Sequence, residues 1–220
     1  MHLPVALNMT GCSALIIGEG VAAADKAAYL ADFGVQTVVL VAPDVDVAPS
    51  IQDLADNAQI SVRRSTYEAA LLDGYSLIII ATGDSAQDRS IATDARRCGA
   101  IVNVVDDPDV CDVFATAYVK RGPVSIAVST GGRSPAFAAA LRENLDRMLS
   151  TEIDAQLRQY VVWRDHVKDL VPSPSAREQL WRELRGAGLY DVFLRDGAHV
   201  ASRLVDEAIA RHAGRGPGGK

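Results

Sequence analysis

The sequence predicts an α/β fold in which a doubly wound parallel sheet is followed by a region of helices alone. Three observations lead to this prediction. Short apolar runs rich in β-branched residues alternate with helical patterns through the first half of the chain. The first of these runs enters a glycine turn directly, as a buried parallel strand does before a helix. From residue 151 onward only helical periodicity is present.

Five apolar runs in the first half are expected to form buried strands, at residues 13–17, 37–41, 60–62, 77–81 and 101–105. Alanines and leucines at helical spacing predict a helix at 21–33, and a helical pattern predicts another at 87–97. A polar segment at 51–57 is also expected to be helical. Gly34 and Gly99 supply the stops after the first and last of these helices. This alternation is typical of a sheet whose strands run parallel.

The pattern changes after residue 112. One more strand is expected at 125–128, and Ser134 with Pro135 forms a good N-cap and first helical residue for a helix that runs to about 149. Helical periodicity then continues to about residue 212, with breaks at 172–175 and 186–188. The remaining tail, 213–220, is expected to be disordered.

The composition excludes several classes of protein. The chain has 220 residues, and its 22 Lys+Arg against 28 Asp+Glu give a net charge of −6, which argues against a general nucleic-acid-binding surface. Cys12, Cys98 and Cys111 lack paired spacing and indicate reduced thiols, neither disulfides nor a metal site. With no basic leader and no apolar run near the roughly 20 residues that span a bilayer, we expect a cytoplasmic protein that contacts no membrane.

Residues 18–23 fit the pattern G-x-G-x-x-A between a predicted strand and a predicted helix. In a dinucleotide-binding loop, Gly18 would permit the tight turn and Gly20 would let the backbone approach a pyrophosphate. The N–H groups at the start of the helix, around Val21 and Ala22, would bind the phosphates. The alternative is a tight turn with a purely structural role.

In a dinucleotide-binding domain an acidic residue at the end of the second strand usually binds the ribose of the cofactor, but here that position is not acidic. Val41 and Ala42 stand where an acidic residue commonly ends the second strand, so Asp44, slightly further along, is the candidate. No neighbouring arginine suggests a 2′-phosphate, which favours NAD over NADP. Glu19 inside the loop would repel a pyrophosphate unless its carboxylate points away.

Carboxylates also gather at the end of a later strand, in the stretch 103–107. The carboxyl ends of strands are where open α/β sheets bind ligands and carry out chemistry. Asp106 and Asp107 are therefore candidates for acid–base chemistry, and the alternative for each is a turn or N-cap residue before Pro108.

Taken together, the motifs resemble those of the precorrin-2 dehydrogenase/sirohydrochlorin ferrochelatase family, the dehydrogenase–chelatase module of sirohaem synthases. The resemblance covers residues 1–149 specifically and the helical tail in outline. The matching residues are Leu3-Pro4, the Gly18 loop with Lys26, Ala81-Thr82 with Asp84, Asn103-Val104-Val105-Asp106, Cys111-Asp112, and Ser129-Thr130-Gly131-Gly132 with Ser134-Pro135.

The resemblance implies a Rossmann-type parallel sheet, a dimerisation region and a small all-helical C-terminal domain. Its boundaries would be 1–113 for the NAD-binding domain, 114–149 for the dimerisation and substrate region, 150–212 for the helical domain and 213–220 for the tail. It implies a homodimer that oxidises the tetrapyrrole precorrin-2 to sirohydrochlorin with NAD. Many members of the family then insert ferrous iron.

The resemblance also implies roles for particular residues. Asp106 would be the catalytic base, with Asp107 as the lesser candidate and Asp112 as a structural residue. Thr82 and Asn103 would join the glycine loop in binding the cofactor. The substrate carboxylates would meet the loop formed by Ser129, Thr130, Gly131 and Arg133, although this loop could also be only a capped turn. Further candidate cations are Lys120, Arg121 and Arg142.

Three departures from the family pattern stand out: Glu19 replaces a glycine, Asp25 replaces an arginine and Gly83 replaces an aspartate. They put bifunctionality in doubt and keep two alternatives open. One is an NAD-sensing regulatory module, which would share the glycine loop but would need neither 103–106 nor the Ser129 loop. The other is a divergent tetrapyrrole-binding chelatase that has lost cofactor binding, as Glu19 hints.

Overall fold

A computed structural model describes residues 2–213 of the chain. The chain divides into two compact units. The first unit holds the residues up to 116 together with 129–135, and the second holds 117–128 together with the residues from 136 onward. The units therefore cut across the predicted segment 114–149, and the boundaries given above remain predictions. The expected tail lies, beyond Ala213, outside the described residues.

The first unit is built on a parallel sheet of five strands in the order β3-β2-β1-β4-β5. The chain runs outward from β1 to β3, then crosses back to β4, so the strand order reverses between β1 and β4. Ligands bind at such switch points in open α/β sheets. The elements are β1 (Ser13–Ile17), α1 (Val21–Asp32), β2 (Gln36–Val41), α2 (Pro49–Asp56), β3 (Ser61–Arg64), β4 (Leu77–Ile80), α3 (Ser85–Arg97) and β5 (Ile101–Val104).

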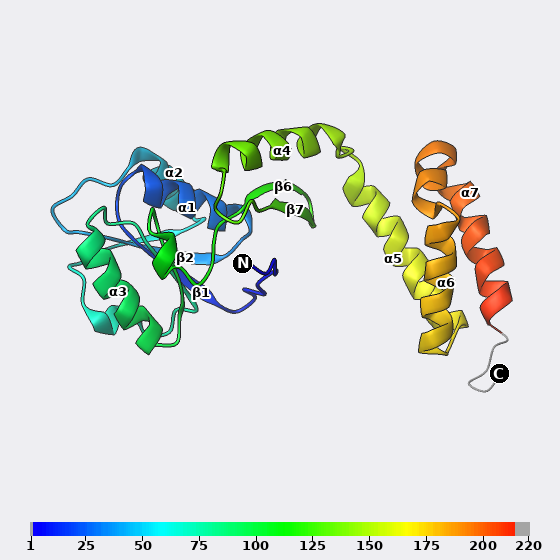
Figure 1. The fold of residues 1–220 in the computed structure, drawn as a ribbon, viewed down its shortest axis with the longest axis horizontal. Coiled ribbons are helices and arrows are strands. Elements are labelled where there is room, and N and C mark those ends of the chain that lie inside the picture. Colours follow the sequence, from blue (N-terminus) through cyan, green and yellow to red (C-terminus); the bar gives the residue numbers. More distant parts are fainter. Residues whose placement is uncertain (1, 214–220) are drawn as a thin grey trace. The chain divides into compact units, whose positions relative to one another are not determined.

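Helices cover both faces of this sheet (Figure 1). On one face α1 and α2 pack a core around Ala14, Ile16 and Ile79. On the other face α3 packs against Leu15, Ile78 and their neighbours. Successive side chains of a strand point to opposite faces, so strands covered on both sides must be apolar throughout, as the short runs in the sequence are. The predicted parallel α/β fold is confirmed.

The second unit begins with a hairpin that the sequence revealed only in part. β6 (Ala117–Arg121) pairs antiparallel with β7 (Val124–Val128), and residues 122–123 form the turn. The strand β7 was expected, but β6 was missed. Its sequence AYVKR ends in two cations and only Val119 is buried, so it carries little of the apolar signal that marked the other strands.

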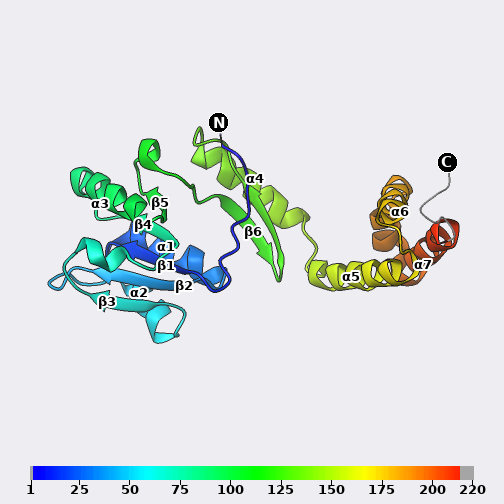
Figure 2. The same ribbon diagram turned by 90° about the horizontal axis from the view of Figure 1, so that it is seen from below.

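Four helices complete this unit: α4 (Pro135–Met148), α5 (Ile153–Leu170), α6 (Pro174–Gly186) and α7 (Leu189–His212). The last three pack together around a core that includes Trp163, Leu180 and Val205 (Figure 2). The indole N–H of Trp163 donates to Oγ of Ser202 at 2.9 Å. The helix breaks fall where the sequence placed them, but the bend in α7 at Gly197, with φ 82°, was not expected.

Candidate functional site

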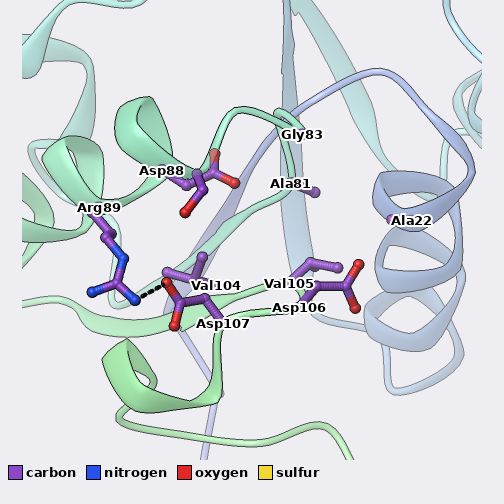
Figure 3. A pocket seen from close by; sticks show the side chains of 10 residues that line it. Ala22, Ala81, Gly83, Asp88, Arg89, Val104, Val105, Asp106 and Asp107 are labelled. Atoms are coloured by element: carbon purple, nitrogen blue, oxygen red, sulfur yellow. Dashed lines mark ion pairs between the residues drawn. The ribbon is translucent and has the colours of Figure 1, made fainter.

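A cavity of about 390 Å³ lies in the first unit where β4 and β5 end (Figure 3). The start of α1 borders it through Ala22, and the start of α3 borders it from the other direction. It therefore lies beside the point where the strand order reverses. The lining residues are Ala22, Ala81, Gly83, Ser85, Asp88, Arg89, Val104, Val105, Asp106 and Asp107.

The two glycines of the loop after β1 have different jobs. At Gly18 φ is +142°, and a Cβ there would lie 2.3 Å from the carbonyl oxygen of Ala81. Only glycine lets β1 and β4 approach so closely at this turn. Gly20 is the N-cap of α1, and a Cβ there would meet no atom within 4 Å. The space in front of Gly20 is therefore open to a ligand.

The first turn of α1 fits a phosphate group. No side chain within the described residues caps this helix, so its first N–H groups point outward without a protein acceptor. Val21 is exposed and Ala22 faces the cavity, which joins the helix start to the space over β4 and β5. A dinucleotide bound with its pyrophosphate at Gly20 would thus have room for its second half in the cavity.

Asp106 stands directly after the last hydrogen bond of β5, in which Val105 N–H donates to Ile80 O at 2.9 Å. A turn follows, closed by Asp107 N–H to Val104 O at 3.4 Å. Asp106 is the third residue of this turn and has φ 62°, the sign of φ that type II turns require there. Its side chain is exposed and points toward the helix that carries Ala22 (Figure 3).

The neighbouring carboxylate, Asp107, points the other way and is paired. Its Oδ2 lies 2.7 Å from Nη2 of Arg89, and only 15% of the Asp107 side chain is exposed. Asp106 has no ion pair or side-chain hydrogen bond within residues 2–213. The geometry separates the two candidates: Asp106 presents a free carboxylate to the cavity, whereas Asp107 is neutralised by Arg89.

Thr82 holds the rim of the cavity and does not line it. Its hydroxyl donates to Oδ1 of Asp88 at 2.5 Å and accepts from Asp84 N–H at 3.2 Å. Asp84 then caps α3 by accepting from Ala86 and Gln87. Sequence reasoning missed Asp88 and Arg89 as lining residues. Both residues lie in the first turns of a helix that follows a strand ending at the cavity. That position in the sequence could have indicated them.

Asn103 lies inside β5, 7% exposed and outside the cavity lining. Its Nδ2 donates to Val113 O at 2.8 Å, which ties β5 to the chain that returns beside it. Its Oδ1 has no hydrogen-bond partner among the described residues. The expected role in cofactor binding remains a prediction, and the contacts observed here are structural.

The turn after β2 carries the candidate ribose partner, and the structure adds one feature that the local sequence did not show. Asp44 is exposed just beyond the end of β2. However, an arginine is close: Nη1 of Arg64 donates to Val45 O at 2.8 Å. β3 pairs with β2 so that Arg64 lies opposite Val41, which brings an arginine distant in sequence to this turn. Local sequence alone could not show this.

The loop from Ser129 to Arg133 belongs to the first unit, but none of its residues lines the cavity. Gly131 N–H donates to Oγ of Ser129 at 3.2 Å, and the Thr130 hydroxyl bonds Ser134 on both its N–H and its C=O. These contacts make a well-ordered turn. Arg133 is exposed there.

Other polar candidates are engaged elsewhere. Arg121 pairs with Asp146, and Arg142 with Glu143 at 3.4 Å. Among residues 2–213, no group of three or more His, Cys, Asp or Glu side chains is placed to hold a metal ion. Over the same residues, no helix combines the length and the apolar character needed to cross a membrane.

Comparison with known proteins identifies the class. Residues 5–117 match the family described as putative NAD(P)-binding, so the chain belongs to that family. Residues 121–148 match the central region of the sirohaem biosynthesis protein family. The chain therefore joins an NAD(P)-binding module to a segment that matches the central region of sirohaem biosynthesis proteins, in agreement with the resemblance found in the sequence.

Individual relatives agree with this assignment. A sirohaem synthase of Methylococcus capsulatus is 36% identical over 94% of this chain and 43% of its own length. One of Chromobacterium violaceum is 31% identical over the same shares. The chain thus spans less than half the length of these relatives. The structure described as SirC, precorrin-2 dehydrogenase, shares the fold with a TM-score of 0.67, 20% identity, and coverage of 94% of this chain and 100% of that one.

Proposed function

We propose that the protein is an NAD-dependent precorrin-2 dehydrogenase, which oxidises precorrin-2 to sirohydrochlorin. The observation that carries this proposal is the free carboxylate of Asp106 at a cavity shared with the start of α1. An NAD(P)-binding loop and a base at the same cavity are what a dehydrogenation requires. The names of the sirohaem synthases and of the structural relative supply the substrate.

The proposed reaction removes a hydride and a proton from precorrin-2 and yields sirohydrochlorin, NADH and a released proton. Bound NAD supplies the hydride acceptor. The chain's own contribution is to bind the pyrophosphate at Gly20 and to accept the proton at a carboxylate oxygen of Asp106. Asp107 cannot share this task while Arg89 holds it. This difference between the two carboxylates supports Asp106 as the base.

The direct test is incubation of the purified protein with precorrin-2 and NAD, followed by absorbance of NADH and of sirohydrochlorin. Equal amounts of both products are expected. Binding of NAD without any turnover would favour an NAD-sensing module instead. Metal insertion without NAD binding would favour a chelatase that has lost its cofactor.

We propose NAD as the cofactor, with Asp44 binding its adenosine ribose. Arg64 makes this choice testable because an arginine is the side chain that accommodates a 2′-phosphate. Its hydrogen bond to Val45 O instead holds the turn that carries Asp44. Calorimetric titration should give tighter binding of NAD than of NADP. Asp44→Ser should narrow that difference, whereas a preference for NADP in the unmodified protein would reverse the assignment.

For the substrate we propose that the loop with Ser129, Thr130, Gly131 and Arg133 binds carboxylates of the tetrapyrrole. The exposed guanidinium of Arg133 is a good carboxylate ligand, and the hydrogen bonds within the turn fix the loop that carries it. Arg133→Gln should raise the KM for precorrin-2 and leave the Kd for NAD unchanged. An unchanged KM would leave the loop with the structural role of a turn.

A second candidate activity is insertion of ferrous iron into sirohydrochlorin, which would make the protein also a lyase. Asp106 favours it, because metal insertion requires removal of pyrrole N–H protons and a free carboxylate can accept them. The iron here is a substrate. The test is anaerobic incubation of sirohydrochlorin with ferrous iron, with Asp106→Ala as the control that should lose the activity.

We further propose that the protein is a homodimer. On α4, Phe137, Leu141 and Met148 are spaced to lie on one face and are 62%, 38% and 80% exposed. An apolar stripe of this kind is typical of a surface that a partner covers. Sedimentation velocity should give a dimer, and Leu141→Glu with Met148→Glu should give a monomer that still binds NAD.

A further inference from the structure

The sulfur of Cys111 contacts the backbone at both ends of the turn that presents Asp106. Val104 N–H donates to Sγ at 3.2 Å, and Sγ lies 3.2 Å from Val104 O and 3.3 Å from Asp107 O. These two residues begin and end the turn that presents Asp106. We propose that Cys111 is a positioning residue for the reaction: its thiol fixes the turn and so fixes the carboxylate of Asp106 at the cavity.

The position of β5 at the edge of the sheet explains why a side chain is needed here. Within the described part of the chain, β5 pairs with β4 alone, so its outer N–H and C=O groups have no strand to bind there. The chain that returns beside β5 supplies hydrogen-bond partners for these groups: Asp112 N–H donates to Val102 O at 2.8 Å, and Asp112 Oδ2 accepts from Val102 N–H at 3.1 Å. Cys111 does the same one step further along, at Val104. Unpaired backbone groups here would cost stability and order.

The thiol is in the right state for this role. Burial raises the pKa of Cys111, so the sulfur keeps its proton and can donate to a carbonyl oxygen. Two acceptors, Val104 O and Asp107 O, lie within reach of that proton. A protonated sulfur therefore ties both ends of the turn. Asp106, held with positive φ, depends on that closure because this conformation is costly for a residue other than glycine.

The inference rests on the proposed function, since it assigns to Cys111 the placement of the proposed base. Three substitutions separate its hydrogen bonds from its volume. Cys111→Ser keeps a hydrogen-bond donor and acceptor. Cys111→Val fills the space but can form no hydrogen bond. Cys111→Ala removes the hydrogen bonds and the volume. Cys98→Ser is the matched control, because Cys98 is an exposed thiol at the far end of α3.

We expect Cys111→Val and Cys111→Ala to lower kcat about tenfold or more while the Kd for NAD stays within about twofold, and Cys111→Ser to restore most of kcat. Hydrogen–deuterium exchange should show faster exchange of the peptide containing Val104 in the valine and alanine variants only. This readout does not require turnover, so it tests the closure of the turn separately from catalysis.

The outcomes distinguish the proposed function from the role of Cys111. If the unmodified protein does not oxidise precorrin-2, the proposed function fails, and the exchange measurement still tests the turn. If the protein is active and Asp106→Ala is inactive, but Cys111→Val keeps full kcat, the positioning role is overturned. Equal loss in the serine and valine variants would also overturn it, because hydrogen bonding would then not be the cause.

Discussion

The turn after β1 and the turn after β5 end their strands at the same edge of the sheet, but their backbone groups are treated in opposite ways. The second turn lines the cavity directly, whereas the first leads into α1, which borders the cavity through Ala22. The glycine turn leaves the N–H groups of α1 without a capping side chain and the space before Gly20 open. In the Asp106 turn the backbone groups are paired: Asp107 N–H donates to Val104 O, and Cys111 bonds both Val104 N–H and Asp107 O. The first turn leaves backbone groups free of a capping side chain, and the second uses its backbone hydrogen bonds to fix the position of one side chain.

The largest effect is expected at the side chain that the second turn holds. Asp106→Ala should lower kcat by about 10²–10⁴-fold, the usual contribution of a general base. Because the carboxylate is exposed and unpaired, the fold and the Kd for NAD should not change. Stopped-flow absorbance and calorimetry measure the two quantities. Normal turnover in this variant would remove Asp106 from the base role.

The two glycines of the first turn should differ from one another. Gly18→Ala places a Cβ against Ala81 O and should cost about 2–3 kcal/mol of unfolding free energy, measured by denaturant titration. Gly20→Ala meets no protein atom, so stability should hold while the Kd for NAD rises about tenfold, equal to about 1.4 kcal/mol.

A Gly20→Ala variant with unchanged NAD affinity would show that the pyrophosphate does not lie against this residue. The glycine turn would then lose its assigned ligand, although the close approach at Gly18 would stand.

A smaller effect is expected where the second turn meets α3. Arg89→Gln removes the partner of Asp107, and because the guanidinium is 53% exposed, the loss of stability should be about 0–1 kcal/mol. The freed carboxylate would stand next to Asp106 as a second negative charge, which should lower kcat/KM by repelling the carboxylates of the tetrapyrrole. An identical kcat/KM in both proteins would show that the pairing of Asp107 does not influence the reaction.

A last effect, confined to alkaline pH, concerns neither turn and serves as a reference. Burial, with the hydrogen bond to Asp94, raises the pKa of Tyr67 from 10.0 to about 12. Because the folded state favours the neutral phenol, this stabilisation is complete below pH 10 and is lost as pH rises from 10 to about 12. Melting curves of Tyr67→Phe should lose that part of the alkaline decline. An unchanged decline would exclude this phenol as its source.

How far the sequence predicted the site follows from the same contrast. A loop that binds a dinucleotide through its backbone requires glycines at fixed spacing, so the motif at residues 18–23 could be recognised directly in the sequence. Asp106 was found through its place at a strand end and through family resemblance. The pairing of Asp107 with Arg89 was not found, because it depends on how α3 packs over β5. Arg64 escaped for the same reason, since only strand pairing brings it to the turn after β2.

For the fold, the parallel sheet was predictable because strands buried on both faces are apolar throughout. β6 was not, since it mixes charged and apolar residues and buries one side chain. The breaks between α5, α6 and α7 were readable from proline and glycine, but the single Gly197 inside α7 gave no sign that it would bend the helix.

The Trp163 indole is buried in the helical core and bonded to Ser202, and its position affects how the stability of the protein can be measured. The chain contains two tryptophans, and both Trp163 and Trp181 lie in the second unit. Intrinsic tryptophan emission therefore arises from the second unit. The stability of the sheet in the first unit should be followed by circular dichroism or by release of bound NADH.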